Sequence, residues 1–158
     1  ELNVIAHADA VFIHFWAGCF HQVLDAKKKY HFKLAVDFDT YRDFDDMEQY
    51  APYIDYFMIS GEENLLYHFE DFSRKYDGLF NMSLAERGSV TCFRGEYYRV
   101  PASKVGHVID TTGCGDSYHA GFVCEHLIHG DIAEAMKKGS ELETAHLKKH
   151  STFYCAVI

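Results

Sequence analysis

The sequence predicts an α/β protein with a mostly parallel sheet, helices on both faces of the sheet and an antiparallel hairpin at one edge. Two observations predict this fold class. Four short runs rich in apolar and aromatic residues alternate with segments long enough for helices, a pattern typical of parallel sheets. Later in the chain, two further strand-like runs flank Arg94-Gly95, which is a hairpin signal. The 158 residues are enough for one domain with a substantial core.

Each element is expected from its local pattern. The four strands of the parallel part are expected at residues 10–14, 34–37, 54–59 and 79–84. The helices between them are expected at residues 20–30, 43–50 and 62–76. The hairpin strands are expected at 89–93 and 96–100. A glycine loop at 110–116 then leads into a helix that ends near residue 128, and Gly130-Asp131 separates this helix from a last one at 132–150.

Composition and charge exclude several classes of function. The formal net charge is −9, and this acidic excess argues against nucleic-acid binding, which needs clustered Lys and Arg. No run reaches the ~20 apolar residues of a membrane helix, so no membrane partner is expected. The five cysteines are an odd number without a C-x-x-C pair, which favours buried thiols and a cytoplasmic location. The chain begins at Glu1 without Met or a signal peptide, so we expect it to be a fragment.

The glycine loop is the most informative segment. Gly113 and Gly115 bracket Cys114 where a helix is expected to start, and glycine lets a ligand approach the backbone closely. The first N–H groups of a helix have no partner within the helix and favour anions. Asp116 could take the proton of an attacking hydroxyl while these N–H groups stabilise a transferring phosphoryl group. The alternative is that Asp116 only caps the helix.

This loop resembles the C-terminal signature of the ribokinase-like (PfkB) carbohydrate kinases. It reads Asp110-Thr-Thr-Gly-Cys-Gly-Asp116 and continues into Ala120-Gly121-Phe122, where the family has D-T-x-G-A-G-D and a helix with A-G-F. Cys114 and Tyr118 replace a small residue and Phe. The resemblance covers residues 11–150 and only the C-terminal part of such kinases. It implies a ribokinase-like three-layer α/β/α sandwich that lacks the N-terminal strands and the lid, with residues 1–158 as a single domain, the ATP-binding and catalytic portion.

The resemblance also implies roles within the loop. Asp116 would be the catalytic base, which orients the acceptor hydroxyl and takes its proton late in phosphoryl transfer. Gly113, Cys114 and Gly115 would supply the backbone N–H groups of an anion hole.

Two groups of residues would hold cations, as the resemblance implies. Asp110 and Thr112 stand where the family binds a monovalent cation, often K⁺. Glu63 would organise Mg²⁺ and its waters, and Ser60 replaces the Asn of the family's N-x-x-E motif. From the residues alone, Asp110 could equally hold a turn, and Glu63 could compensate a helix dipole.

A second loop resembles the family's nucleotide loop T-L-G-x-K-G-S. It reads Ser83-Leu-Ala85-Glu-Arg-Gly88-Ser89, which implies that Ser83, Ala85 and Gly88 bind ATP. Ser for Thr keeps the hydroxyl. Ala85 replaces the expected Gly, adds a methyl group and restricts positive φ.

Within the family, the segments YIDYFMISGEEN and RGEYYRVPA are most similar to fructoselysine and fructosamine kinases. The resemblance implies phosphorylation of a hydroxyl on a small-molecule sugar or sugar–amine adduct, with ATP and Mg²⁺ as cofactors and K⁺ as a candidate. Two alternatives stay open: a nucleoside kinase of the same family, and a truncated, non-catalytic nucleotide-binding fragment. A homodimer is among the expected assemblies.

The histidines offer a competing metal hypothesis. His126 and His129 lie three residues apart, and His146 and His150 lie four apart, spacings that could bind zinc on a helix. Neither pair belongs to an H-E-x-x-H motif. We therefore expect these residues to lie on solvated helix faces.

Overall fold

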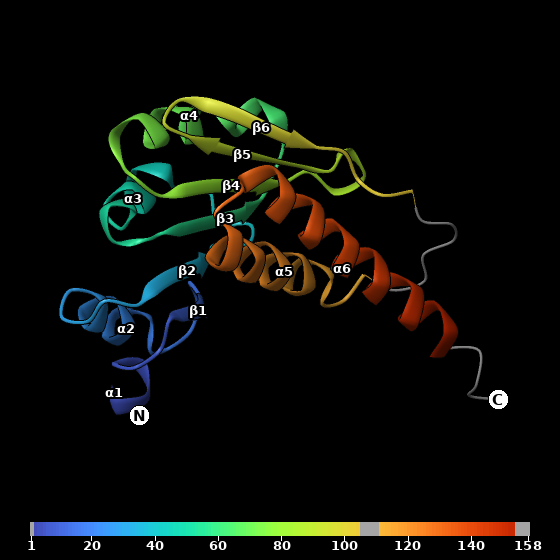
Figure 1. Cartoon of the computed structure of the whole chain (residues 1–158). Helices are drawn as coiled ribbons and strands as arrows, with labels where there is room; N and C mark the ends of the chain where they lie inside the picture. Colours follow the sequence, from blue (N-terminus) through green and yellow to red (C-terminus); the bar gives the residue numbers. More distant parts are fainter. Residues whose placement is uncertain (1, 105–110, 154–158) are drawn as a thin grey trace. The chain divides into compact units, whose positions relative to one another are not determined.

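The computed structural model describes the backbone of residues 2–104 and 111–153 (Figure 1). The chain forms two compact units. Unit 1 comprises the described residues up to Leu84 together with Val90–Tyr97. Unit 2 comprises Ala85–Ser89 together with the described residues from Tyr98 onward. The assignment of residues 1–158 to a single domain stays a prediction.

Six strands form one sheet, and their order in the sheet is their order in the chain. They are β1 (Ala10–His14), β2 (Lys33–Asp37), β3 (Tyr56–Ser60), β4 (Leu79–Ser83), β5 (Ser89–Phe93) and β6 (Glu96–Val100). The first four strands pair in parallel. Arg94 and Gly95 alone join β5 to β6, and so short a connection permits only an antiparallel pair. The predicted mostly parallel sheet with an antiparallel edge hairpin is confirmed.

The helices of unit 1 connect the parallel strands, except for α1, which precedes β1. They are α1 (Leu2–Ile5), α2 (Phe20–Lys27), α3 (Phe44–Glu48), α4 (Leu66–Lys75) and the 3₁₀ helices η1 (Ala51–Tyr53) and η2 (Glu63–Leu65). Right-handed crossovers between strands in sequential order place their helices on one face of the sheet. Compared with the expectations, α2 ends at Lys27 and not at residue 30, and α1 was not expected. Asp43 is the N-cap of α3 and accepts a hydrogen bond from the Asp46 N–H at 3.0 Å.

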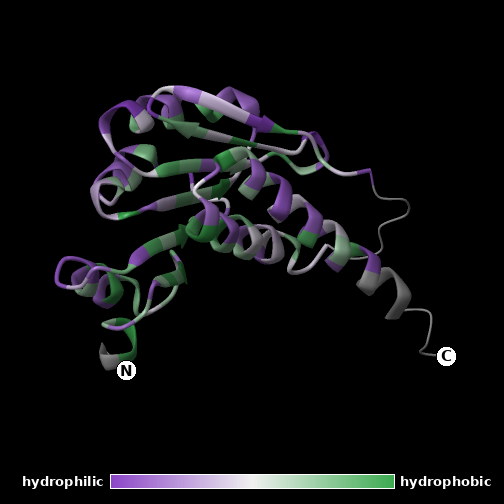
Figure 2. Cartoon of the chain, in the orientation of Figure 1, coloured by the Kyte–Doolittle hydropathy of each residue, from purple (hydrophilic) through white to green (hydrophobic). Residues whose placement is uncertain are grey.

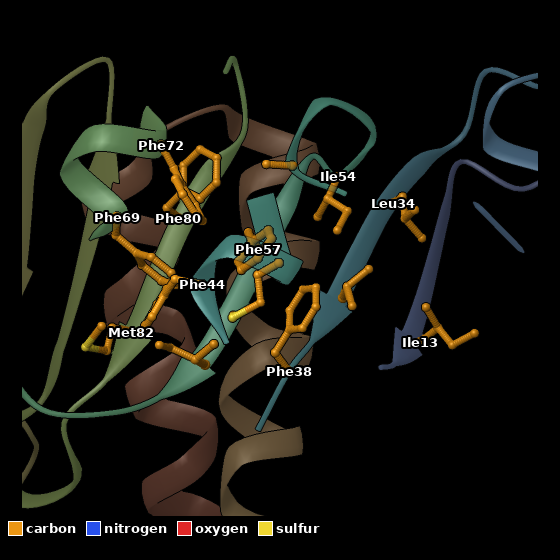
Figure 3. Close-up of a cluster of buried hydrophobic side chains, with 14 of the residues drawn as sticks. Ile13, Leu34, Phe38, Phe44, Ile54, Phe57, Phe69, Phe72, Phe80 and Met82 are labelled. Atoms are coloured by element: carbon orange, nitrogen blue, oxygen red, sulfur yellow. The ribbon is translucent and has the colours of Figure 1, made fainter. Parts of the chain in front are cut away.

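The core of unit 1 is built from alternate residues of the central strands and the inner faces of α2, α3 and α4 (Figure 3). Phe57 on β3 is fully buried, and its ring stacks on Phe38 with the centroids 4.3 Å apart. Phe69 meets the same ring edge-on at 5.6 Å. Figure 2 shows hydrophobic segments in β2, β3 and β4, whereas most of β6 is neutral or hydrophilic. The alternating strands and helices of unit 1 therefore share one core that is rich in aromatic side chains.

A partly buried carboxylate ties the beginnings of β2 and β3 to α2. Asp55 accepts hydrogen bonds from Lys27 Nζ at 2.6 Å, Lys33 Nζ at 2.8 Å and the Leu34 N–H at 2.9 Å. Burial alone would raise the pKa of Asp55, but the hydrogen bonds from the two lysines outweigh burial and hold this pKa below its usual value.

Unit 2 contains η3 (Ala85–Arg87) and two long helices, α5 (Cys114–His129) and α6 (Ile132–Phe153). The two helices approach closely at a pair of glycines. A Cβ on Gly121 would lie 3.0 Å from the Gly139 Cα, and a Cβ on Gly139 would lie 2.8 Å from the Tyr118 carbonyl oxygen. Side chains larger than hydrogen would force the helices apart at this point. Among the residues that the structure describes, no helix is both long and apolar enough to cross a bilayer.

Candidate active site

The glycine loop ends in a left-handed residue that starts α5. Gly113 is the N-cap, with φ 78° and ψ 3°, and the first helical bond runs from the Ser117 N–H to the Gly113 carbonyl at 3.0 Å. Only glycine adopts such a φ at little cost. Asp116 lies in the first helical turn, and its side chain is exposed. Because Gly113 occupies the N-cap position, the alternative in which Asp116 caps the helix is wrong.

The N–H groups of this turn are of two kinds. The Cys114 N–H is donated to the Thr111 carbonyl at 3.1 Å, so it closes a turn within the loop. The Gly115 and Asp116 N–H groups lie in the first helical turn, where the helix itself offers no acceptor. Among the described residues, no atom outside the loop and the helix backbone lies within 4 Å of a Cβ placed on Gly115, so this part of the chain leaves the backbone there open to an incoming group. This geometry favours an anion at the N–H groups of Gly115 and Asp116, whereas the N–H group of Cys114 stabilises the loop itself.

His146 on α6 contacts the same loop from the other helix of unit 2. Its Nε2 lies 2.8 Å from the Thr112 carbonyl oxygen. A Cβ on Gly113 would lie 3.2 Å from the same nitrogen. His146 is thus partly exposed, as expected, but it also contacts the glycine loop, which the spacing of histidines within one helix does not predict.

The nucleotide-loop residues of unit 2 form a tight turn. Ala85 has φ 51°, so the position does require the left-handed region that the family's Gly would supply. Gly88 has φ 90° and donates its N–H to the Ala85 carbonyl at 3.0 Å. A Cβ on Gly88 would lie 2.1 Å from the Val100 carbonyl oxygen. The packing of the turn alone therefore demands glycine at residue 88.

A buried hydrogen bond joins this turn to α5. The Tyr118 hydroxyl donates to Ser89 Oγ at 2.8 Å, and both side chains are almost fully buried. The hydroxyl that distinguishes Tyr118 from the family's Phe therefore has a defined partner. This bond fixes the start of α5 to the last residue of the predicted nucleotide loop.

In unit 1, Ser60 and Ser83 meet at the carboxyl ends of β3 and β4. The Ser83 hydroxyl donates to Ser60 Oγ at 3.2 Å, and the Gly61 N–H donates to the Ser83 carbonyl at 2.9 Å. The structure thus brings together two predicted site residues that are 23 positions apart in the chain. Glu63 begins η2, three residues after Ser60. In open parallel sheets, ligands bind at this end of the strands.

Arg42 is a residue of this region that sequence reasoning missed. Its guanidinium donates to the carbonyl oxygens of Asp39, Tyr41 and Ser60. Burial lowers the pKa of Arg42 from its ordinary value. The side chain therefore holds the end of β3 against the segment that follows β2. The signal in the sequence was a lone cation inside a markedly acidic stretch.

A cavity of about 400 Å³ lies beside this arginine. Its lining consists of Arg42, Phe44, Glu62, Asn64, Leu65 and His68. The rings of Phe44 and His68 stack in parallel with the centroids 3.9 Å apart. Three carbonyl groups hold the guanidinium in place at the edge of this cavity, and Glu62 in the lining adds a negative charge beside it.

The expected cation sites differ in how well they fit. Among the described residues, no group of three or more His, Cys, Asp or Glu side chains could hold a metal ion. A Mg²⁺ ion carried by a nucleotide keeps several waters and needs only one or two carboxylates, so Glu63 alone remains compatible with that role. At the monovalent-cation position, the Thr112 carbonyl is already bonded to His146, and Asp110 lies outside the described residues.

Comparison with known proteins identifies the family. The sequence pattern of the pfkB family carbohydrate kinases matches residues 22–157. The chain belongs to this family. The glycine loop, α5 and the nucleotide loop all lie within the matched range.

Two curated relatives and one solved structure show how much of a pfkB kinase is present. Fructosamine kinase FrlD from Bacillus subtilis is 26% identical over 112 residues, which cover 68% of this chain and 39% of the relative. A nucleoside kinase from Methanocaldococcus jannaschii is 36% identical over 70 residues, 44% of this chain and 23% of the relative. The ribokinase of Arabidopsis thaliana, solved with ribose and ATP, superposes with a TM-score of 0.69 at 19% identity over 93% of this chain and 52% of that structure.

These comparisons set the extent of the match. The chain spans less than half the length of the two curated relatives and about half of the solved structure. The structural similarity, at this low identity, confirms the ribokinase-like fold and carries no information about the substrate.

Proposed function

We propose that this protein transfers a phosphoryl group from ATP to a hydroxyl of a small sugar or sugar–amine adduct, with Asp116 as the base. The observation that carries the proposal is the arrangement at the start of α5, where an exposed carboxylate shares one helical turn with the open Gly115 backbone. Membership of the pfkB family supports the reaction class. The similarity to fructosamine kinase FrlD supports the sugar–amine acceptor.

The residues act in two ways. The N–H groups of Gly115 and Asp116 donate to the oxygens of the transferring phosphoryl group, where negative charge must be stabilised. The Asp116 carboxylate accepts a hydrogen bond from the acceptor hydroxyl, which orients the attacking oxygen, and takes the proton late in the transfer. An exposed carboxylate is too weak a base to ionise a sugar hydroxyl beforehand, so positioning is its main contribution.

ATP binding is assigned to Ser83, Ala85 and Gly88, and Mg²⁺ to Glu63 with Ser60. Bound Mg²⁺ would supply charge neutralisation at the phosphates. Ser60 and Ser83 support this assignment because their hydroxyl groups already face each other at adjacent strand ends. The cytoplasmic location and the homodimer remain predictions.

The decisive variant is Asp116→Asn, which keeps the size of the side chain but cannot take a proton. Turnover of ATP with a panel of sugars and fructosamines is measured on this chain and on the complete open reading frame that encodes it. We expect turnover to fall by at least about 10²-fold, the contribution typical of general base catalysis, while ATP affinity stays nearly unchanged.

Asp131→Asn is the matched control. Asp131 lies at the start of α6, and its carboxylate accepts a hydrogen bond from the Glu134 N–H at 2.9 Å, so it is a helix-capping acid in the same unit. Its replacement should leave turnover unchanged. A kcat for Asp116→Asn within a few-fold of the unmodified protein removes Asp116 from the mechanism. ATP binding without turnover of any acceptor in the complete protein favours the non-catalytic nucleotide-binding alternative.

A nucleoside acceptor is the second candidate. The 36% identity to the Methanocaldococcus jannaschii nucleoside kinase favours this acceptor, although the similarity covers a shorter segment of 70 residues. Inosine, cytidine and adenosine therefore belong in the acceptor panel. Phosphorylation of a nucleoside in preference to every sugar would replace the sugar–amine proposal and retain the role of Asp116.

A further inference from the structure

The Thr112 carbonyl oxygen is the atom at which the pfkB resemblance and the structure of this chain disagree. The resemblance assigns Thr112 to a monovalent cation, whereas the structure places His146 Nε2 2.8 Å from its oxygen. We propose that His146 replaces the monovalent cation at Thr112 and acts as a positioning residue for the anion hole. This proposal rests on the function proposed for the glycine loop.

The chemistry of the contact determines the state of the histidine. A carbonyl oxygen can only accept a hydrogen bond, so Nε2 must carry a hydrogen, either in the neutral Nε2–H tautomer or in the imidazolium form. In both forms the hydrogen carries positive charge and points at the oxygen. The imidazole donor uses one of the two lone pairs of this oxygen, so a K⁺ ion would have to share the oxygen with a positively polarised hydrogen, which weakens its binding there.

A second contact extends the effect of His146 to the start of α5. A Cβ on Gly113 would lie 3.2 Å from Nε2 and 3.4 Å from Cε1 of His146, so the ring packs directly over the left-handed N-cap. Thr112 and Gly113 are consecutive, and the Gly115 N–H follows two residues later. By holding both residues, the imidazole fixes the direction in which the open N–H groups of α5 point.

The close packing of the two helices positions the ring. His146 follows Gly139 by seven residues, which is two helical turns, so both lie on the same face of α6. Gly139 is the point at which α6 touches the backbone of α5. The glycine contact and the histidine contact therefore form one continuous seam between the helices, and the seam ends at the glycine loop.

The first test requires no substitution. Binding of ATP with Mg²⁺ is measured by calorimetry in KCl and in tetramethylammonium chloride at equal ionic strength. If the imidazole replaces the cation, the affinity of the unmodified chain should agree between the two salts within about twofold. An affinity that rises more than about fivefold in KCl overturns the proposal.

Two variants separate the hydrogen bond from simple packing. His146→Leu fills the space without a donor, and His146→Gln can place an amide N–H near the former Nε2. His146→Leu should bind ATP roughly fivefold to tenfold more weakly in tetramethylammonium chloride, the loss typical of one hydrogen bond, and regain affinity in KCl. His146→Gln should remain insensitive to the cation. A His146→Leu variant that is equal to the unmodified chain in both salts overturns the proposal.

Amide hydrogen exchange gives a readout that does not depend on nucleotide. Exchange of the Cys114 and Ser117 N–H groups should accelerate about tenfold in His146→Leu, stay slow in His146→Gln, and slow again in His146→Leu when K⁺ is added. His129→Leu, at the exposed end of α5, is the control and should change neither rate. Unchanged exchange in His146→Leu refutes the positioning role. If ATP does not bind the unmodified chain, the proposed function fails while this exchange experiment still decides the role of His146.

Discussion

Two partly buried carboxylates differ between the units: in unit 1 Asp55 accepts three hydrogen bonds, two of them from lysines, whereas in unit 2 burial raises the pKa of Glu143. The nearby charge of His119 offsets this rise only in part. The hydrogen bonds of Asp55 hold its pKa below the usual value. The hydrogen bonds therefore favour the ionised form of Asp55, whereas burial disfavours the ionised form of Glu143.

The two units also differ in how their elements pack together. Unit 1 buries large rings such as Phe57, Phe69 and Phe80 in one cluster. Unit 2 relies on close backbone contact between α5 and α6 at Gly121 and Gly139. A large aromatic core tolerates small shifts of its members, but a backbone contact permits no added atom. Unit 2 should therefore be the more easily disrupted of the two.

Gly139→Ala should have the largest effect. Its new methyl group would lie 2.8 Å from the Tyr118 carbonyl oxygen, a backbone atom that cannot turn away. We expect a loss of about 3 kcal/mol, the upper part of the range for overpacking, seen as accelerated amide exchange in α5 and α6. The control is Gly115→Ala, where a Cβ meets no atom within 4 Å and should not destabilise α5. Equal acceleration in β2, β3 and β4 would show that the two units do not differ in this way.

Removing the two carboxylates should shift stability in opposite directions. Asp55→Asn should cost about 1–2 kcal/mol at neutral pH because it removes charge from hydrogen bonds with Lys27 and Lys33. Glu143→Gln should stabilise the chain by a smaller amount at neutral pH, because the neutral amide avoids the cost of burying a charge. Urea unfolding of both variants and of the unmodified chain gives the comparison.

The pH dependence of these two effects has opposite sign. The pKa of Asp55 is lower in the folded state than in the unfolded state, where it is about 4. The contribution of Asp55 to the free energy of unfolding is therefore fully present above about pH 4 and is lost as the pH falls through the folded-state pKa. The pKa of Glu143 is raised, so the cost of its ionisation is absent below about 4 and grows as the pH rises through the folded value. The two substitution effects should both vanish in acid. A gain from Glu143→Gln that persists at pH 3 would contradict the explanation by burial.

Ala85→Gly should have the smallest effect. Ala85 has φ 51°, a left-handed conformation that costs a non-glycine residue roughly 1 kcal/mol, so glycine should stabilise the nucleotide loop by up to about that amount. Arg94, with φ 52° in the hairpin of unit 1, is the matched site, and Arg94→Gly should give a similar gain in the melting temperature. If Ala85→Gly also tightens ATP binding whereas Arg94→Gly does not, the loop acts in binding and not only as a turn.

Local patterns were sufficient to predict the strands and the hairpin. The β5–β6 hairpin was predicted from Gly95 between two strand-like runs, and the structure places both Arg94 and Gly95 at positive φ, of which only the glycine is visible as a signal in the sequence. The glycine loop was found because its motif is contiguous. Each of the two signals is contained within a short continuous segment of the chain.

Contacts between distant segments could not be predicted in this way. The bond from Arg42 to the Ser60 carbonyl joins residues 18 positions apart, and the contact of His146 with Thr112 spans 34. Each depends on how helices and strand ends meet in space, and a single sequence carries no record of that. Neither the contact of His146 with Thr112 nor the bonds of Arg42 to the end of β3 follow from local patterns in the sequence.

The hydrogen bond between Tyr118 and Ser89 has a consequence for how this chain can diverge. Phe at residue 118 would deprive the buried Ser89 hydroxyl of its donor, and a larger apolar residue at 89 would displace the Tyr118 hydroxyl. Ser89 ends the nucleotide loop and Tyr118 follows the candidate base by two residues, so a change at either residue alters the local structure of both segments of unit 2.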